Sequence, residues 1–497
     1  MEKKPAPESR PNVLVITVDQ WPGSFLGCAG HPQIQTPTID ALARAGTRFT
    51  NAYSETPVCI PARRTLMTGV PPRRHGDRAF NETLPLPPDL PTLAGTFRAA
   101  GYQAYASGKL HVYPVRARIG FDDVALCEEG RVQFGTTDDY EESLARAGYP
   151  GEAFYHGLSV NGYETRSWHL PERHHMTNWT TEQMIRYIKR RDPSRPSFWY
   201  LSYNGPHPPI APPADFRRLY DGVTPPAPPV GAWARDDDRL PGLVLEARHR
   251  FFHPRPDTFA EALRAYYAVC THVDNQLRLV IGTLREEGLL ANTVILLTAD
   301  HGDMLGQHGC WAKRLYYERS ARVPMILVGA NQDPRVALNA TDDRLAGLQD
   351  VMPTVLTLAG VPVPRGVTGL PLTGAKRRDY LFGEINHGIA ASRMIREGDL
   401  KLIYYPEGNL FQLFDVARDP DELEDLASDP AHRAALRRLQ GRLRDELHGD
   451  DVKWRRGAKW VGLPRRETAA VVRALDARAH HLVNQRGSHF PLPPKRA

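Results

Sequence analysis

Three short apolar runs, each followed at once by polar residues, constrain the fold of this chain more than any other feature. The runs cover residues 13–18 (VLVITV), 198–203 (FWYLSY) and 293–298 (TVILLT). Continuous apolar runs of this length, without alternation, are typical of strands buried on both faces of a parallel sheet. Because sites in such sheets lie just beyond the carboxyl ends of the strands, we expect the polar residues that follow the runs to meet.

The residues after the first and third runs are Asp19-Gln20 and Asp300-His301. Two carboxylates, an amide oxygen and an imidazole suit a hard divalent cation. The alternative for Asp19 is that it caps the next turn. His207 follows the second run on a loop stiffened by prolines, where a structural and a functional role are equally open.

Helical periodicity is clearest over residues 259–287, and Gly288 marks its end. Shorter helices are expected at 37–49, 93–100, 180–190 and 348–359, and further strands at 102–107 and 325–328. Polar loops and short helices are expected over 115–180, with a solvated acidic face at 138–142, and a long surface excursion over 211–256.

The pattern changes near residue 375, where short alternating strands replace the long apolar runs. These strands are expected at 393–396, 400–405 and 411–414. A helix that covers them is indicated by a leucine stripe at Leu436, Leu439, Leu443 and Leu447. We therefore expect an α/β protein with a larger domain at 1–375 and a smaller α+β domain with a basic tail at 376–497.

Composition excludes several classes of function. The 497 residues are 41% hydrophobic and 24% charged, as in a globular protein. A net charge of +6 without a dense Lys/Arg run suits an anionic substrate but not nucleic acid. Five irregularly spaced cysteines indicate neither a disulfide framework nor a zinc ribbon. A polar N-terminus and the lack of a long apolar run favour the cytoplasm over a membrane. The sequence does not decide between a monomer and a homo-oligomer.

Residues 59–63 (CIPAR), which run into a short helix at 64–69, are the most compact functional candidate. A cysteine at a helix start beside an arginine lies in a positive field that favours anions, whereas an isolated cysteine is more often a buried structural residue. Lys109 and His111 follow the strand at 102–107, and alternation places both on one face, where they suit an anion. Lys313 either lies at the surface or reaches the same anion.

Taken in chain order, these parts resemble the type I, formylglycine-dependent sulfatases of the alkaline phosphatase superfamily. The matching segments are Asp19-Gln20, Cys59-x-Pro61-x-Arg63, Lys109-x-His111, Gly205-Pro206-His207, Asp300-His301-Gly302 and Lys313, and, nearer the C-terminus, residues 400–404, 413–415 and 419–422. The resemblance spans nearly the whole chain. It implies an α/β/α sandwich around a large, mostly parallel sheet, and a smaller domain with a short antiparallel sheet and a helix.

Two pairs depart from the usual sulfatase pattern. Many members have Asp-Asp at the place of residues 19–20 and Asp-Asn at that of residues 300–301. The pairs found here are similar to those of phosphonate monoester hydrolases and, in part, of choline sulfatases. Ile60 and Arg64 are also larger than the residues usual at their positions.

The same resemblance implies that Cys59 is oxidised to formylglycine (3-oxoalanine) by a formylglycine-generating enzyme, and that the hydrated aldehyde attacks the ester. The implied metal ligands are Asp19, Gln20, the converted Cys59, Asp300 and His301. The other implied contacts are Arg63 and Lys109 on the diol, Lys109 and Lys313 on the sulfate, His207 as acid toward the leaving oxygen, His111 as base toward the second hydroxyl, and Asn81 on a substrate oxygen. Calcium is the usual metal of sulfatases, and His301 leaves manganese open.

The resemblance therefore implies hydrolysis of a sulfate ester, a small anionic substrate, in the manner of an arylsulfatase. A phosphonate monoester or phosphodiester hydrolase with the same site is the alternative. A non-catalytic anion-binding descendant is disfavoured, because every polar position of the site is filled.

Overall fold

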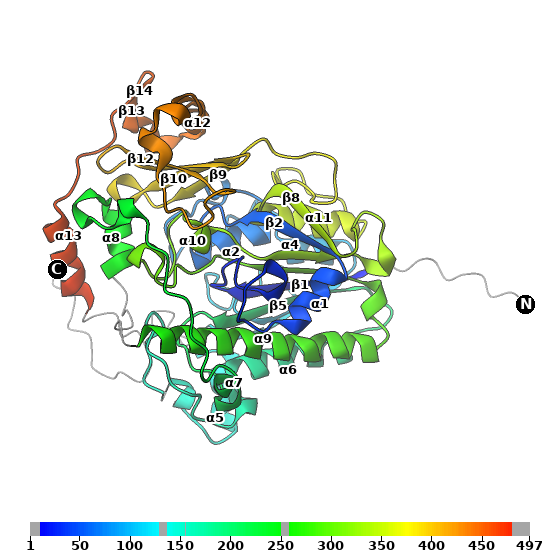
Figure 1. Ribbon diagram of the computed structural model, residues 1–497. Helices are drawn as coiled ribbons and strands as arrows, with labels where there is room; N and C mark the ends of the chain where they lie inside the picture. The colour runs from blue at the N-terminus through cyan, green and yellow to red at the C-terminus, as the bar shows by residue number, and fades with distance from the viewer. Residues whose placement is uncertain (1–9, 129–136, 155, 250–257, 480–497) are drawn as a thin grey trace, which may run out of the picture.

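A mostly parallel sheet of eight strands forms the centre of the molecule. The computed structural model describes residues 10–128, 137–154, 156–249 and 258–479. Strand order in the sheet is β4-β3-β5-β1-β6-β7-β2-β8 (Figure 1). The strands are β1 (Asn12–Asp19), β2 (Thr47–Tyr53), β3 (Gln103–Gly108), β4 (Asp123–Leu126), β5 (Ser197–Pro206), β6 (Thr293–Ala299), β7 (Met325–Val328) and β8 (Ala340–Gly347). Of these eight strands, β7 alone runs antiparallel to its neighbours, β6 and β2.

The three apolar runs form three adjacent strands of this sheet, as the sequence predicts. β1 lies between β5 and β6 and pairs in parallel with both. Every residue of the three strands is buried, because a strand without a polar face must be covered on both sides. Their carboxyl ends point the same way, so Asp19, His207 and Asp300 leave the sheet at one edge.

Helices cover both faces of the sheet and produce the expected α/β/α sandwich (Figure 1). On one face α9 (Phe259–Glu286) and α6 (Met176–Lys189) pack against β5, with α1 (Pro37–Arg44) beside α9. On the other face lie α2 (Cys59–Thr68), α4 (Leu93–Ala99) and α11 (Val351–Leu358). Shorter helices lie between these elements: α3 (Pro72–His75), α5 (Asp139–Arg146), α7 (Ala214–Arg218), α8 (Gly242–His249) and α10 (Glu318–Ala321).

The helix expected at 37–49 is too long, and the strands β2, β4 and β8 are missing from the prediction, β4 within the segment 115–180 expected to hold only loops and short helices. The helix ends at Arg44, and β2 begins at Thr47. Between them Gly46 crosses β7 so closely that a Cβ there would lie 2.0 Å from the carbonyl oxygen of Leu327. This close approach of two backbones, which hydrophobic periodicity does not record, lies between the end of the helix and the start of the strand.

Two predicted surface segments are partly buried instead. In the acidic stretch 138–142, Asp138 is buried and caps α5 by accepting a hydrogen bond from the Glu141 N–H. Within 211–256, α8 is largely buried and packs against α13 (Thr468–Ala479). Part of that excursion (250–256) and the end of the predicted basic tail (480–497) lie outside the described residues.

The C-terminal part contains the predicted antiparallel sheet, with one strand more than expected. Its order is β12-β11-β10-β9, with β9 (Leu381–Ile385), β10 (Ser392–Glu397), β11 (Leu400–Tyr405) and β12 (Leu410–Asp415). α12 (Arg433–Glu446) covers it through the buried Leu439 and Leu443. A short hairpin of β13 (Arg455–Arg456) and β14 (Lys459–Trp460) follows. Within the described ranges, no helix has both the length and the apolarity needed to cross a membrane.

A buried network of charges joins the two sheets. Arg78, which follows α3, lies 3.0 Å from Glu384 on β9 and 2.8 Å from Asp451. Arg393 on β10 also pairs with Asp451, at 2.7 Å, and His448 Nε2 lies 2.8 Å from Glu384 Oε2. Both carboxylates are thus already neutralised by guanidinium groups, which makes this cluster an ion-pair network and not a cation site.

We expect Glu384→Gln to lower the free energy of unfolding by about 3 kcal/mol at pH 7. Burial raises the pKa of Glu384, but a hydrogen bond from His448 and the charges of Arg393 and Arg78 outweigh it and lower the pKa from 4.5 to about 2. A carboxyl with a lowered pKa stabilises the folded state above its unfolded pKa and loses that contribution as the pH falls. The measurement is urea unfolding of both proteins from pH 7 down to pH 3.

The difference in the free energy of unfolding between the unaltered protein and Glu384→Gln should therefore stay constant down to about pH 5 and shrink below that pH. Glu142→Gln is the matched control, because Glu142 pairs with Arg146 on the surface with 53% of its side chain exposed. This substitution should change the free energy of unfolding by less than about 1 kcal/mol. A pH-independent difference for Glu384→Gln would show that the network does not act through this carboxylate.

Candidate active site

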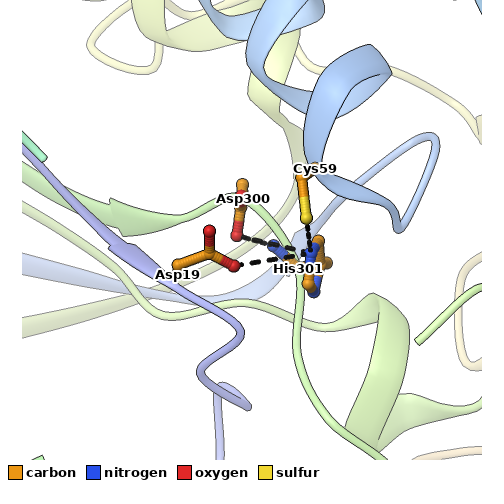
Figure 2. Close-up of side chains that lie close together, drawn as sticks. All are labelled: Asp19, Cys59, Asp300 and His301. Carbon is orange, nitrogen blue, oxygen red and sulfur yellow. Dashed lines mark hydrogen bonds and ion pairs between the residues drawn. The ribbon is translucent and has the colours of Figure 1, made fainter. Parts of the chain in front are cut away.

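The ends of β1 and β6 and the start of α2 meet at one point at the edge of the main sheet (Figure 2). Cys59, the first residue of α2, places its Sγ 3.2 Å from His301 Nε2. That nitrogen lies 3.7 Å from a carboxylate oxygen of Asp19 and 3.7 Å from one of Asp300. None of the four side chains is more than 1% exposed. Segments distant in the sequence thus form one buried polar cluster.

Arg63, one turn along α2, ties this cluster together. Its Nε donates to Asp300 Oδ2 (2.9 Å) and its Nη2 to Asp19 Oδ2 (3.1 Å). Its Nη1 donates to Ser202 Oγ on β5 (2.8 Å) and to the carbonyl of Lys109 (3.0 Å). A planar guanidinium with a fixed fork of donors therefore holds residues from four segments. The helix that carries it is buried at all ten of its positions.

Two lysines bring further positive charge to the cluster. Lys109 Nζ lies 2.6 Å from Asp19 Oδ2, and Lys313 Nζ lies 2.6 Å from both Gln20 Oε1 and His207 Nε2. His207 Nδ1 lies 2.7 Å from the carbonyl oxygen of its neighbour Pro208. Because a carbonyl only accepts, Nδ1 carries the proton and Nε2 accepts from Lys313.

The surroundings of Cys59 favour a negative charge at that position. Burial raises the pKa of the thiol. The charges of Lys313, Lys109 and His301 and a hydrogen bond from His111 lower the pKa by more than burial raises it, so the pKa lies well below its usual value. A buried structural cysteine shows the opposite behaviour, as at Cys270, where burial raises the pKa of the thiol well above its usual value. The cluster is therefore built to hold an anion.

The donor set also fits a divalent cation. Asp19 Oδ1 is buried and accepts no hydrogen bond from any residue that the structure describes. A buried carboxylate oxygen in that state is costly unless a cation faces it. The ligand atoms of Asp19, Cys59, Asp300 and His301 all lie within 4.8 Å of one another, which is close enough to share one ion.

His111 and Asn81 differ in how far they match the prediction. His111 contacts Cys59, but not as part of a strand, because its φ of 58° places it in a left-handed turn beyond β3. Glu128 Oε1 holds that turn by accepting hydrogen bonds from the Leu110 and His111 N–H groups, at 2.8 and 2.7 Å. Asn81 is exposed and accepts two hydrogen bonds from Thr83, so its contact with substrate stays a prediction.

Comparison with known proteins identifies the family. The model of the Sulfatase family matches residues 11–361, and that of the N-sulphoglucosamine sulphohydrolase C-terminal region matches residues 306–448. The chain belongs to the sulfatase family. It is 32% identical to an arylsulfatase of Clostridium perfringens, over 90% of this chain and 97% of the relative. It is 31% identical to a choline-sulfatase of Rhizobium meliloti, over 85% of this chain and 83% of the relative.

Solved structures support the fold assignment. A phosphonate monoester hydrolase of Agrobacterium radiobacter superposes with a TM-score of 0.76 at 24% identity, covering 87% of this chain and 95% of that one. A second, from Silicibacter pomeroyi, gives 0.73 with 87% and 94% coverage, also at 24% identity. By its family, this sulfatase is a sulfuric ester hydrolase.

Arg63→Lys tests the role of the guanidinium in this sulfatase. The variant keeps the charge but cannot reach the four acceptors, and each buried acceptor left without a donor costs about 1–3 kcal/mol. We therefore expect the free energy of unfolding, measured in urea, to fall by about 2–4 kcal/mol. Arg98→Lys, at a surface pair with Asp122, is the control and should change it by less than about 1 kcal/mol. Equal losses in the two variants would contradict this role for Arg63.

Proposed function

We propose that this sulfatase hydrolyses organic sulfate esters with residue 59, converted from cysteine to formylglycine, as its nucleophile. One observation carries the proposal: Cys59 lies among two carboxylates and an imidazole, with two buried lysines and Arg63 around it. A cysteine that serves only packing is surrounded by apolar groups. The present surroundings instead suit a reacting anion held by fixed positive charges.

The residues proposed to hold the cation are Asp19, Gln20, Asp300 and His301, together with the converted residue 59. When present, the cation and the hydrated aldehyde supply an activated oxygen nucleophile. We propose calcium, since carboxylate and amide oxygens are the ligands that it prefers. The imidazole of His301 is the reason to test manganese beside it.

Lys109 and Lys313 are proposed to bind the sulfate oxygens. Removing one donor aimed at such developing charge typically costs about 3–4 kcal/mol in the transition state. His207 Nδ1 donates to the Pro208 carbonyl and Nε2 accepts from Lys313 Nζ, so a proton that His207 passes to the leaving oxygen must first reach Nε2 from the Lys313 ammonium group. We therefore assign protonation of the leaving oxygen to the pair of His207 and Lys313. His111, in contact with residue 59, is the proposed base that accepts a proton from the second hydroxyl.

Partner and location stay proposals of the same kind. The substrate is proposed to be a small anionic ester. The conversion of Cys59 makes a formylglycine-generating enzyme the proposed transient partner, and we retain the cytoplasm as the proposed location.

We expect mass spectrometry to find 3-oxoalanine in place of cysteine in the tryptic peptide that holds residue 59. We also expect Cys59→Ala to lower turnover of 4-nitrophenyl sulfate by at least about a thousandfold, because the nucleophile is lost. Cys28→Ala, at a partly exposed thiol outside the cluster, is the control and should keep full turnover. Unmodified cysteine together with undiminished turnover in Cys59→Ala would end the proposal.

Hydrolysis of phosphonate monoesters is the second candidate, favoured by the glutamine at position 20 and the histidine at position 301. The likeness in fold to phosphonate monoester hydrolases is compatible with it. We expect kcat/KM to be higher for 4-nitrophenyl sulfate than for 4-nitrophenyl phenylphosphonate, measured side by side on one preparation. The reverse order would make the phosphonate ester the preferred substrate, and its loss in Cys59→Ala would keep the same site responsible.

A further inference from the structure

Gln20 differs from the other proposed cation ligands because only one end of its side chain is able to ligate. Its amide oxygen is a ligand for a hard cation, and its amide nitrogen is not. The backbone of Gln20 is held in place on both sides. Its N–H donates to Asp300 Oδ1 (3.2 Å), and its carbonyl accepts from the hydroxyl of Tyr266 (2.6 Å). What remains to be fixed is which end of the amide faces the site.

Asp303 and Tyr163 fix that choice. Gln20 Nε2 donates to Asp303 Oδ2 (2.6 Å) and to the hydroxyl of Tyr163 (3.1 Å). Tyr163 in turn donates to the same carboxylate oxygen, at 2.7 Å, which closes a triangle. The amide nitrogen thus faces two oxygens, and Oε1 faces Lys313 Nζ at 2.6 Å. An ionised carboxylate only accepts, so a turned amide would place oxygen against oxygen.

The second oxygen of Asp303 holds a different part of the site. Asp303 Oδ1 accepts from the N–H groups of Leu305 and Ala312, both at 3.0 Å. These residues bound the loop that leads directly into Lys313. Asp303 is completely buried, and its hydrogen bonds therefore link the orientation of Gln20 with the position of Lys313.

We propose that Asp303 is a positioning residue of the cation site, whose carboxylate turns the oxygen of the Gln20 amide, and not its nitrogen, toward a divalent cation. The inference rests on the proposed role of Gln20 as a ligand. A carboxylate at position 20 would have two equivalent oxygens and would need no such partner. The requirement for Asp303 is thus a consequence of having glutamine there.

Asp303→Asn tests this, because asparagine offers one acceptor where aspartate offers two. If the nitrogen of the new asparagine faces Gln20, the glutamine must turn its amide oxygen toward that nitrogen. The glutamine then presents its amide nitrogen to the cation. If its nitrogen faces the loop, Leu305 and Ala312 lose their acceptor. We expect the affinity for Ca²⁺ to fall about 10–100-fold, as for other groups that orient metal ligands. The measurement is calorimetric titration of the chelator-stripped full chain with CaCl₂, repeated with MnCl₂.

The double variant Gln20→Glu/Asp303→Asn separates orientation from mere structural support. Gln20→Glu alone brings a second carboxylate against Asp303. In the double variant the new glutamate instead accepts a hydrogen bond from the asparagine amide and still offers an oxygen to the cation. We therefore expect the double variant to bind Ca²⁺ more tightly than either single variant. Asp274→Asn is the matched control, because Asp274 is also buried and accepts two backbone N–H groups, at the start of α1. It should lose stability without losing cation affinity.

The outcomes distinguish this inference from the proposed function. Absence of cation binding in the unaltered protein overturns both. Binding that is unchanged in Asp303→Asn, or a double variant no tighter than the single variants, overturns the inference alone. Should Asp303→Asn fail to fold, the double variant still decides, since restored folding and binding are expected only if residue 303 acts through residue 20.

Discussion

The hydrogen bonds from Arg63 to Asp19 and Asp300 are the contacts on which the rest of the site depends. Two carboxylates at the ends of neighbouring parallel strands repel each other in a buried environment. The guanidinium between them, carried by a fully buried helix, makes their proximity tolerable and sets their orientation. It also fixes Cys59, which lies one turn earlier on the same helix. The proposed nucleophile and the proposed cation ligands are therefore positioned by one side chain.

The large features of this protein are predictable from the sequence because they rest on periodicity. Uninterrupted apolar runs can only be satisfied by burial on both faces, and this places the residues after β1, β5 and β6 at one edge. The sequence also predicts that Cys59 and Arg63 lie on one face of a helix, since four residues make about one helical turn. Family resemblance added the order of the segments, which no single motif provides.

The features that the sequence does not predict depend on left-handed backbone and on loops without a pattern. His111 and Leu305 have φ values of 58° and 43°, conformations that hydrophobic spacing does not encode. Tyr163 and Glu128 reach the site from stretches of 115–180 that belong to neither a helix nor a strand, where no periodicity applies. Asp303 lies in the same polar stretch as Asp300. The proposed role of Asp303 depends on contacts with residues 20, 163, 305 and 312, which no pattern in the sequence links to it.

The charges shared by Arg78, Glu384 and Asp451 also bear on where this chain can be cut. A chain ending near residue 375 would keep Arg78 buried beside the main sheet but would lose both carboxylates that neutralise it. It would also uncover the apolar side chains that the small sheet shares with Tyr316 and Tyr317, just beyond Lys313. The two sheets are thus separate in topology, but they share buried contacts, and we expect them to unfold together. The smaller sheet covers part of the core that also contains Tyr316 and Tyr317. A shortened chain that is meant to fold should therefore keep both sheets.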